Sequence, residues 1–474
     1  RRRTRLYHGF GDWRFEATFI SKPLNITYIT MKKSLLLTTL FLAGTASVVA
    51  QNPAISAMYT PDPAPYVHGD KVYLFVDHDE DDAIYFKMKD WVLFSTEDMV
   101  NWTYLGAQVS TATFAWAAQG DRAWAQQAVE RNGKWYWYLC CNTADGKDAL
   151  AVAVADKPTG PWKDAVGGPM AIGFGFIDPT VFIDDDGTPY LFWGNKGFWY
   201  GKLNEDMISF ANGYQEVPGY TDPKSIGKER MMTQYEEGPW VTKRNGIYYA
   251  AYASGGVPEH MAYSTAPTIN GPWTYQGRCM DEAENSFTIH GGNINFKGQD
   301  YMFYHNGALA NGGGFRRATC IEEFQFNGDG SIPMIPFTKE GVKPVGTIDP
   351  YKRVEGETMS SSYGVKLDRL AGEEHYVTSI HNGDWVKLRE VDFGKGGAQE
   401  LTAAIRNLKH EGVVEFYLDK LDGKPFAAAS FSEGDTQQVA KMKVLQAPEG
   451  KHDVYVLFRG GDEELFDFDW WQLK

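Results

Sequence analysis

The feature that most constrains the fold of this chain is a turn that recurs five times. Each instance has a glycine followed by a strand-like segment rich in aromatic residues, and successive glycines are 64, 54, 59 and 52 residues apart. Glycine adopts the positive φ of a tight hairpin without steric cost. Units of this kind, repeated with several strands each, are typical of a β-propeller, here with five blades. The five segments are VHGDKVYLF (67–75), RNGKWYWYL (131–139), DDGTPYLFW (185–193), RNGIYYAAY (244–252) and FKGQDYMFY (296–304).

Two further regularities favour a true repeat over five unrelated hairpins in a sandwich. A tyrosine stands three residues after the glycine in four of the segments, so these strands share a register: Tyr136, Tyr190, Tyr249 and Tyr301. A polar turn closed by Trp or Phe follows in four of the five units: STEDMVNW (95–102), ADKPTGPW (155–162), LNEDMISF (203–210) and STAPTINGPW (264–273). Two motifs that keep the same order are typical of repeated blades.

The repeat ends near residue 340, and a second domain follows. We assign residues 51–340 to the propeller and residues 341–352, which contain Pro and Gly, to a linker. Residues 353–474 contain short alternating strands, such as VVEFYLDKL (413–421), and their length fits one small, jelly-roll-like β-sandwich. The predicted fold class is therefore all-β, a five-bladed β-propeller followed by a small β-sandwich.

The N-terminal region has the pattern of an export signal. Met31 is followed by Lys32 and Lys33, then by an apolar run and by small residues up to Ala50. This pattern predicts a signal peptide over residues 31–50, and we interpret residues 1–30 as upstream sequence outside the mature protein. The expected location is the periplasm or the medium. No other stretch is long and apolar enough to cross a bilayer.

The charge of the chain narrows the class of partner. The formal net charge is −15, and the sequence has no long Lys/Arg block. Nucleic acid is excluded as a partner, because phosphate binding requires a basic surface, and an acidic polymer is disfavoured for the same reason. A neutral ligand is the natural fit. The four cysteines lack the spacing of a zinc or redox site and are expected as small buried apolar side chains: Cys140, Cys141, Cys279 and Cys320.

Candidate chemistry lies just before each turn glycine. In a propeller the innermost strand of each blade lines the axis, and the beginning of that strand opens into a central pocket. Similar offsets before the five glycines therefore predict one ring of side chains around a common cavity. The residues at these offsets are Asp62 (seven before its glycine), Trp124 (nine), Asp178 (nine), Glu237 (nine) and His290 (eight).

Three of these five residues are acids, and together they suggest a reaction. A single acid at a strand end is usually solvated, but three acids among apolar neighbours would be partly desolvated, which function or pairing must justify. Clustered carboxylates can cleave a glycosidic bond. A protonated carboxyl gives its proton to the leaving oxygen, and an ionised one activates water or attacks carbon. A third carboxylate nearby keeps the pKa of the acid high by like-charge repulsion. The nearby Asp184, Asp185 and Asp186 crowd a hairpin turn and are expected to be exposed.

At this point the sequence resembles glycoside hydrolase family 43. The resemblance covers residues 58–340 and rests on these motifs: DPAPYVHGDKVYLF, HDE, IDPTVFIDDDG, EGPW and FRRATCIEEFQFNGDGSIP. It implies an inverting glycoside hydrolase with a catalytic set of three residues. Asp62 would be the general base, Asp178 would modulate and orient the acid, and Glu237 would be the general acid.

The same resemblance implies the remaining residues of the site. We expect substrate contacts from Trp91, Trp124, His290 and Arg317, and His290 would stand on the axis beside a metal ion or water. No cofactor is expected for catalysis. The family usually has Trp-Ala-Pro on the second blade, whereas this chain has Trp124-Ala125-Gln126, which changes the pocket wall there.

The C-terminal domain resembles carbohydrate-binding module family 6. The motifs that carry the resemblance are VEGE (354–357), NGDWVKLREVDFG (382–394) and FDFDWW (466–471). Glu355, Glu357 and Asp469 match a structural calcium site, for which hard oxygen ligands are expected. The family's sugar cleft pairs two aromatics with an Asn, but Asp467 holds the Asn position and SEGDTQQ (432–438) lacks the usual Trp. The module is therefore either a weak sugar binder or a structural domain.

Three functions remain at this level. The leading hypothesis is an exo-acting α-L-arabinofuranosidase on plant arabinoxylan or arabinan fragments. The alternatives are a β-D-xylosidase on xylo-oligosaccharides, which uses the same three acids, and an inactive carbohydrate-binding propeller, which the presence of all three acids disfavours. A retaining fructan hydrolase would carry a Trp-Met-Asn-Asp-Pro motif, which is absent from the sequence.

Overall fold

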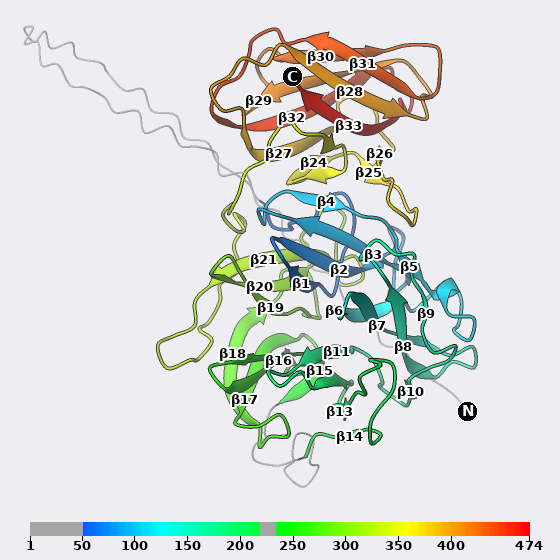
Figure 1. The fold of residues 1–474 in the computed structure, drawn as a ribbon, viewed down its shortest axis with the longest axis vertical. Helices are drawn as coiled ribbons and strands as arrows, with labels where there is room; N and C mark the ends of the chain where they lie inside the picture. Colours follow the sequence, from blue (N-terminus) through cyan, green and yellow to red (C-terminus); the bar gives the residue numbers. More distant parts are fainter. Residues whose placement is uncertain (1–50, 219–233) are drawn as a thin grey trace, which may run out of the picture. The chain divides into compact units, whose positions relative to one another are not determined.

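The computed structural model of the chain describes residues 51–218 and 234–474. The expected upstream segment 1–30 and signal peptide 31–50 lie outside the described residues. The described residues form one compact unit. Apart from one 3₁₀ turn, η1 (Thr111–Thr113), the elements in the described part of the chain are β-strands (Figure 1). The all-β class predicted from the repeat is therefore confirmed.

The strands between residues 64 and 324 form five antiparallel sheets within the described residues, in sequence order. The first sheet contains β1 (Ala64–His68), β2 (Lys71–Asp79), β3 (Met88–Thr96), β4 (Trp102–Tyr104) and β5 (Val109–Ser110). The second contains β6 (Trp124–Arg131), β7 (Lys134–Asn142), β8 (Asp148–Ala155), β9 (Lys163–Asp164) and β10 (Ala171–Ile172). The third contains β11 (Thr180–Ile183), β12 (Pro189–Trp193), β13 (Trp199–Lys202) and β14 (Gln215–Glu216).

The last two of these sheets continue the same plan. The fourth contains β15 (Tyr235–Arg244), β16 (Ile247–Ser254), β17 (His260–Ala266) and β18 (Thr274–Glu282). The fifth contains β19 (Asn293–Phe296), β20 (Gln299–Asn306) and β21 (Ala318–Phe324). In every sheet the first two strands are joined by the turn found in the sequence, and the five turn glycines all have φ between 64° and 84°. A Cβ would contact nothing at these glycines, so their requirement is purely conformational.

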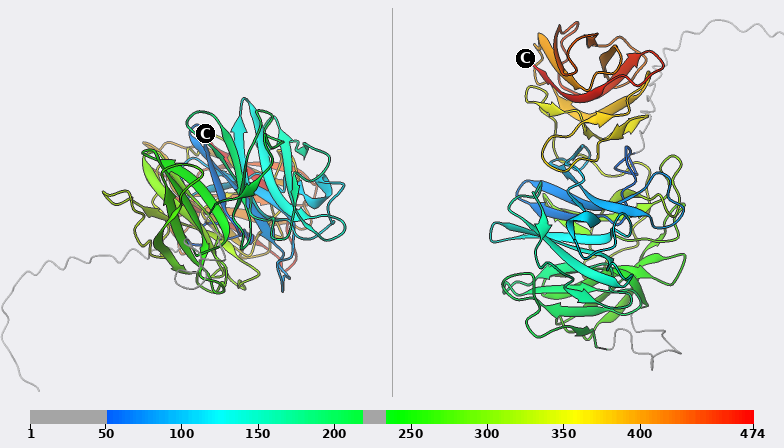
Figure 2. Two further views of the ribbon diagram at one scale, coloured as in Figure 1. Left: turned by 90° about the horizontal axis from the view of Figure 1, so that it is seen from below. Right: turned by 90° about the vertical axis from the view of Figure 1, so that its right-hand side faces the viewer.

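The C-terminal region is a sandwich of two sheets, drawn in yellow to red in Figures 1 and 2. One sheet contains β22 (Val354–Glu355), β25 (Lys366–Leu367), β26 (Val377–Thr378), β33 (Asp467–Leu473), β28 (Glu400–Arg406) and β31 (Gln438–Lys443). The other contains β24 (Ser361–Tyr363), β27 (Trp385–Asp392), β32 (Lys451–Gly460), β29 (Gly412–Leu418) and β30 (Ala427–Phe431). Alternating side chains from both sheets enter one core, as two-faced strands require.

The sandwich is joined to the first sheet by more than the connecting chain. Strand β23 (Thr358–Met359) leaves the sandwich sequence and pairs with β4, so that it extends the first sheet. One apolar core continues from this sheet, including the fully buried Trp102, into the sandwich. The Asn101 side chain both accepts from and donates to the Arg389 backbone, at 2.8 and 2.9 Å. These contacts bind the two regions over a continuous surface.

Residues 341–352, predicted as a linker, contain no strand and lie against both regions. The backbone N–H of Val345 donates to the Asp98 carbonyl, and that of Ile348 donates to the Glu390 carbonyl. The segment is therefore a connection held in place at several points along its length.

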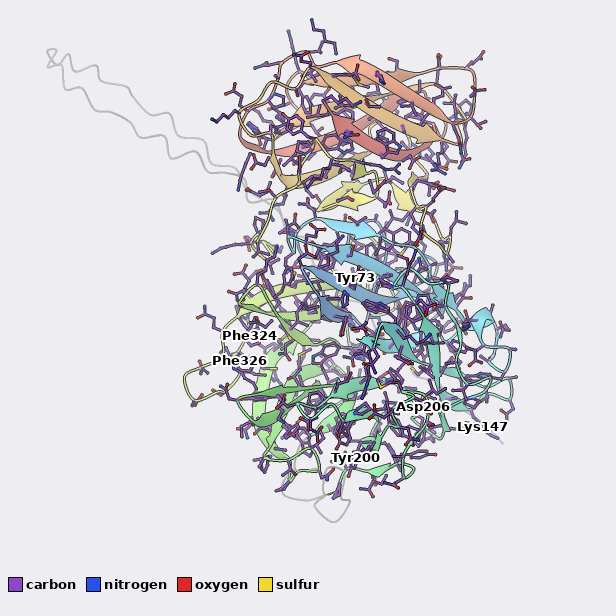
Figure 3. All side chains as sticks on the ribbon, in the orientation of Figure 1. Tyr73, Lys147, Tyr200, Asp206, Phe324 and Phe326 are labelled. Carbon is purple, nitrogen blue, oxygen red and sulfur yellow. The ribbon has the colours of Figure 1, made fainter. Side chains whose placement is uncertain are left out.

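Two expectations about single residues have opposite outcomes. All four cysteines are buried free thiols, as predicted. The prediction that Asp184 is exposed is wrong, because its carboxylate accepts from Lys243 at 2.6 Å and from the Tyr248 hydroxyl at 2.6 Å. Aromatic contacts also continue beyond the strands: the rings of Phe324 and Phe326, labelled in Figure 3, have centroids 5.1 Å apart.

Candidate active site

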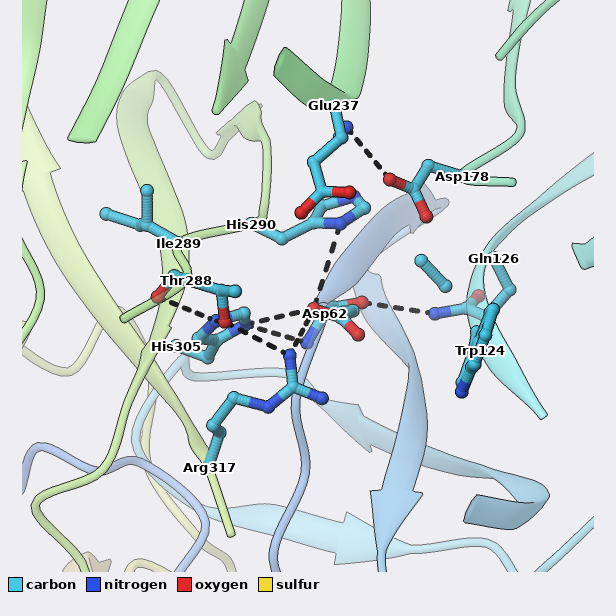
Figure 4. Close-up of polar contacts among 12 residues, drawn as sticks. Asp62, Trp124, Gln126, Asp178, Glu237, Thr288, Ile289, His290, His305 and Arg317 are labelled. Atoms are coloured by element: carbon cyan, nitrogen blue, oxygen red, sulfur yellow. Dashed lines mark hydrogen bonds and ion pairs between the residues drawn. The ribbon is translucent and has the colours of Figure 1, made fainter. Parts of the chain in front are cut away.

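The residues at the five predicted offsets line one cavity of about 400 Å³. Asp62, Trp124, Asp178, Glu237 and His290 come from five different sheets, each from the beginning of its first strand or the segment just before it. Figure 4 shows several of these side chains directed towards the same space. The five side chains therefore share one cavity, as the sequence predicts.

A second group of cavity residues lies at the connections between the second and third strands of the sheets. In an antiparallel sheet the end of the second strand lies at the same edge as the beginning of the first. The segments that join second and third strands therefore also open into the cavity. They contribute Phe86, Asn195, Glu259 and Arg317, and in the second sheet the corresponding residue is Asp148, the first residue of the third strand, β8.

The backbone at two of the acids is unusual. Asp62 has φ 51° and Asp178 has φ 58°, and each directly precedes a proline. A non-glycine residue in this region costs about 1–3 kcal/mol and persists only where its surroundings enforce it. The two acids therefore share a strained local geometry that directs both carboxyls into the cavity.

Glu237 is directed into the cavity by an irregularity in β15. The pairing of β15 with β16 shifts register on both sides of Glu237, and a bulge of this kind redirects a side chain. The Asn195 side-chain amide donates to Oε2 of Glu237 at 2.5 Å. The next residue, Gly238, donates its N–H to Oδ2 of Asp178 at 3.0 Å. The backbone around Glu237 and the carboxyl of Asp178 are thus held together.

Asp62 is kept ionised by a buried arginine. Asp62 is 6% exposed, and its Oδ1 lies 3.2 Å from NH1 of Arg317. Burial raises the pKa of Asp62, but the Arg317 guanidinium, together with His305 and His290, outweighs this effect and holds the pKa well below its usual range. Arg317 is itself fixed by Asp79, which accepts from its Nε at 3.0 Å and from its NH2 at 3.1 Å.

Two histidines complete the surroundings of Asp62. The Asp62 backbone N–H donates to Nδ1 of the fully buried His305 at 3.1 Å, and Oδ1 of Asp62 lies 3.1 Å from the same nitrogen. Nε2 of His305 lies 3.1 Å from both the carbonyl oxygen and the hydroxyl oxygen of Thr288. Burial lowers the pKa of His305. Nδ1 of His290 lies 3.7 Å from Oδ1 of Asp62, and burial lowers the pKa of His290 as well.

The carboxyl of Asp178 lies in the field of the other acids. Asp178 is 5% exposed, and burial raises its pKa well above the usual range, with further contributions from Glu237 and Asp62. Carboxyl groups this close cannot all be ionised together. The cavity therefore retains protons among its acids at neutral pH, as general acid catalysis requires.

The structure places the other predicted contact residues as follows. Arg317 and His290 line the cavity, and so does Trp124, whose Nε1 donates to the Phe86 carbonyl at 3.1 Å. Substrate contact by Trp91 is a wrong prediction: its side chain is fully buried, and its Nε1 donates to the Trp124 carbonyl at 2.7 Å. Trp91 therefore supports Trp124 from behind.

Gln126, which stands where the resembling family has proline, lies behind the cavity wall. Its side-chain amide donates to the carbonyls of Asp62 and Phe75, at 3.3 and 2.9 Å. Its Oε1 accepts from Trp137 at 3.0 Å. The substitution thus adds hydrogen bonds that hold the backbone of Asp62.

The three carboxylates expected to bind calcium lie in the same part of the sandwich, and arginines lie beside two of them. Glu355 and Asp469, together with burial, raise the pKa of Glu357, and Oε2 of Glu357 has no hydrogen-bond partner among the described residues. Arg353 lies 2.8 Å from Glu355 and 3.3 Å from Asp469, and Arg406 lies 2.7 Å from Asp469. No group of three His, Cys, Asp or Glu arranged for a metal occurs in 51–218 and 234–474. The donor chemistry fits a hard cation, while the present pairing is with arginine.

Comparison with known proteins places this cavity in a family context. Residues 50–332 match the model of Glycosyl hydrolases family 43, and residues 355–474 match that of Carbohydrate binding module (family 6). An arabinoxylan arabinofuranohydrolase of Bacillus subtilis (strain 168) is 30% identical over 91% of this chain and 94% of its own length. A xylosidase/arabinosidase of Bacteroides ovatus is 29% identical over 58% of this chain and 94% of its own length.

A solved structure agrees with these sequence matches over both regions. It is a crystal structure of a glycoside hydrolase family 43 arabinoxylan arabinofuranohydrolase from Bacillus subtilis in complex with cellotetraose. The TM-score is 0.76 at 27% identity, and the match covers 90% of this chain and 98% of the other.

In the described residues, no helix is long and apolar enough to cross a membrane.

Proposed function

Because this chain belongs to glycosyl hydrolases family 43 and continues into a family 6 carbohydrate-binding module, we propose that it removes α-L-arabinofuranosyl units from arabinoxylan or arabinan fragments, exo-acting and with inversion. The chain is a glycoside hydrolase. The observation that carries the finer proposal is the meeting of Asp62, Asp178 and Glu237 in one cavity.

Each acid receives a role that its surroundings support. Asp62, ionised beside Arg317, takes a proton from the attacking water as general base. Both Arg317 and His290 approach its Oδ1, so we assign the water to Oδ2. Glu237 gives a proton to the leaving oxygen. Asp178 orients the acid through the Gly238 N–H and adds the third charge of the cavity.

The size and rim of the cavity support release of one terminal unit from a larger substrate. About 400 Å³ is near the lower end of the range of small-ligand pockets, roughly 300–1,000 Å³. Phe174 lines the cavity, yet its side chain is 94% exposed, so it stands at the mouth. We assign to Phe174 a flat apolar contact with the main chain from which the arabinosyl unit branches.

The test of this function combines substrate range, stereochemistry and two variants. Nitrophenyl α-L-arabinofuranoside should be hydrolysed, arabinoxylan should release arabinose, and proton NMR should show inverted configuration in the first product. Asp62→Asn and Glu237→Gln should each lower turnover on the natural glycoside by about 10²–10⁴-fold while the circular dichroism spectrum stays unchanged. Retained configuration, or near-normal turnover in either variant, would contradict the assignment.

A β-D-xylosidase is the second candidate. One observation favours it: the relative from Bacteroides ovatus carries the name xylosidase/arabinosidase. Parallel assays on nitrophenyl xyloside and xylo-oligosaccharides decide between the two, because the preferred sugar must show the higher kcat/KM.

The architecture and the remaining expectations are part of the same proposal. We infer that the five sheets are the blades of a closed propeller, since residues from every sheet line one cavity. We place the catalytic domain at 51–340, the linker at 341–352 and the module at 353–474. Export to the periplasm or medium is proposed from the signal pattern of 31–50, and mass spectrometry of the mature N-terminus tests it. Plant polysaccharide as partner is proposed from the two family matches.

Calcium in the module is proposed on the three carboxylates at Glu355, Glu357 and Asp469. Binding there would replace Arg353 as their source of positive charge. We expect calcium to raise the melting temperature of the full chain, and a chelator to lower it again, because a ligand that binds only the folded state stabilises it. Glu357→Gln should abolish the increase. A melting temperature that does not respond to either reagent contradicts the site. We also propose a metal ion beside His290, and this proposal rests only on the resemblance to glycoside hydrolase family 43.

A further inference from the structure

Besides Asp148, one more carboxyl that lines the cavity, the buried one of Glu259, has no role in the three-acid scheme. Glu259 lies in the segment between β16 and β17, is 3% exposed and lines the same cavity as Glu237. Ionised carboxylates are rarely buried this completely without a cation, because removal from water costs several kcal/mol. Among the described residues its partners are a backbone N–H and another acid, so no cation accompanies the buried Glu259 carboxyl.

The contacts of Glu259 fix its orientation. Its Oε2 accepts from the Ile289 N–H at 3.1 Å, and its own N–H donates to the Phe287 carbonyl at 3.0 Å. One carboxyl oxygen and the backbone are thereby tied to the segment that leads to His290. The Glu259 carboxyl also interacts with the side chain of Glu237.

The charges around Glu259 favour its protonated form. The titratable groups that act on it are Glu237 on β15 and Asp178 ahead of β11, and both are acids. Burial, followed by the effect of Glu237, raises the pKa of Glu259 to about 10. At neutral pH it is therefore a carboxylic acid with an O–H to donate.

We propose that Glu259 is a positioning residue which donates a hydrogen bond to Glu237 and, together with Asn195, stabilises the carboxylate that Glu237 becomes once it has protonated the leaving oxygen. Asn195 holds Oε2 of Glu237 from the equivalent segment of the preceding sheet, between β12 and β13. Glu259 holds the carboxyl from the following segment. The inference rests on the proposed function, because it assigns Glu237 as the general acid.

The proton balance of this arrangement is simple. Glu237 transfers its proton to the leaving oxygen as the glycosidic bond breaks, and the proton of Glu259 stays on Glu259 throughout. The N–H of Asn195 and the O–H of Glu259 then both face the new negative charge. Donors placed where charge develops stabilise the transition state more than the ground state.

The test compares Glu259→Gln with Glu259→Leu on aryl glycosides of different leaving groups. Gln retains a donor at this position, so kcat should stay near that of the wild type. Leu removes it, and kcat on a poor leaving group should fall on the order of 100-fold. On a dinitrophenyl glycoside, which needs little protonation, the Leu variant should lose less than about 10-fold. KM should change little in either case. Glu282→Leu, an exposed acid on the same sheet, is the control and should change nothing.

The outcomes separate this inference from the proposed function. If arabinofuranosides are inert and xylosides are hydrolysed, the sugar assignment fails, and the same leaving-group comparison on xylosides still tests Glu259. Equal losses for every leaving group, or full activity in the Leu variant, overturn the inference.

A second measurement covers the case in which the Leu variant fails to fold. A carboxyl whose pKa is raised in the folded state loses stabilising free energy as pH rises from its unfolded value, about 4.3, towards about 10. Glu259→Gln should therefore gain stability relative to the wild type with rising pH in urea unfolding. A constant difference would show that Glu259 is not protonated in the folded state.

Discussion

At the scale of single residues, the cavity combines one acid whose pKa is held low with others whose pKa values are raised. Arg317 keeps the pKa of Asp62 low, whereas burial and neighbouring acids raise the pKa values of Asp178 and Glu259. A glycoside hydrolase requires both states at one pH. The difference has a structural cause. Among the described residues of this site, Arg317 is the only buried cation, and it contacts Asp62 and Asp79.

Phe174 allows a residue-scale prediction about substrate size. Its side chain is almost fully exposed at the mouth of the cavity, where it can contact only the part of a substrate outside. Phe174→Ala should therefore raise KM on arabinoxylan several-fold, corresponding to about 1 kcal/mol, and leave hydrolysis of nitrophenyl arabinofuranoside unchanged. The control is Val166→Ala, because Val166 is also exposed and lies between β9 and β10 of the second sheet. Equal effects on both substrates would remove Phe174 from the binding of the main chain.

At the scale of elements, the hairpin turn determines which part of the site could be predicted. Counting from the turn glycines located the first group of cavity residues, because four of the five hairpins have two-residue turns, whose register is fixed. Asn195 and Glu259 were missed, although antiparallel pairing places the connections after second strands at the same edge. The hydrogen bond from the Asp62 backbone to His305 and the one from Arg317 to Asp79 depend on loop conformation, which no local sequence pattern encodes. Trp91 was misplaced because an aromatic residue within a strand does not indicate which face it occupies.

The bulge in β15 leads to a prediction at Gly238. Its φ is 63°, and a Cβ would lie 3.1 Å from the His290 ring. Gly238→Ala should lower the free energy of unfolding by about 1–2 kcal/mol through backbone strain and should also reduce kcat by displacing His290. The control is Gly246→Ala, with φ 78° and open space around its Cβ position, which should lose stability and keep its kcat. Normal turnover in Gly238→Ala would show that the His290 ring can move without consequence.

At the scale of the whole molecule, the sandwich acts as a structural part of the first sheet. Strand β23 covers the edge of β4, and Trp102 and Tyr104 are buried within a core that spans both regions. A chain that ends at residue 352 would expose this edge and core, and unpaired edges promote association. We expect the shortened chain to melt several degrees lower and to form oligomers by light scattering. A monomer with an unchanged melting temperature would show that the pairing contributes little.

The pairing of β23 with β4 also bears on how such a chain can change through recombination. A module joined only by a flexible tether can be exchanged between genes as a cassette, since nothing else in the recipient depends on it. Here an exchange at residues 341–352 would also remove the neighbour of β4 and the backbone partner of Asn101. The two regions are therefore expected to be inherited together. Among related chains, the residues where β23 contacts β4 and where Asn101 contacts Arg389 should change together.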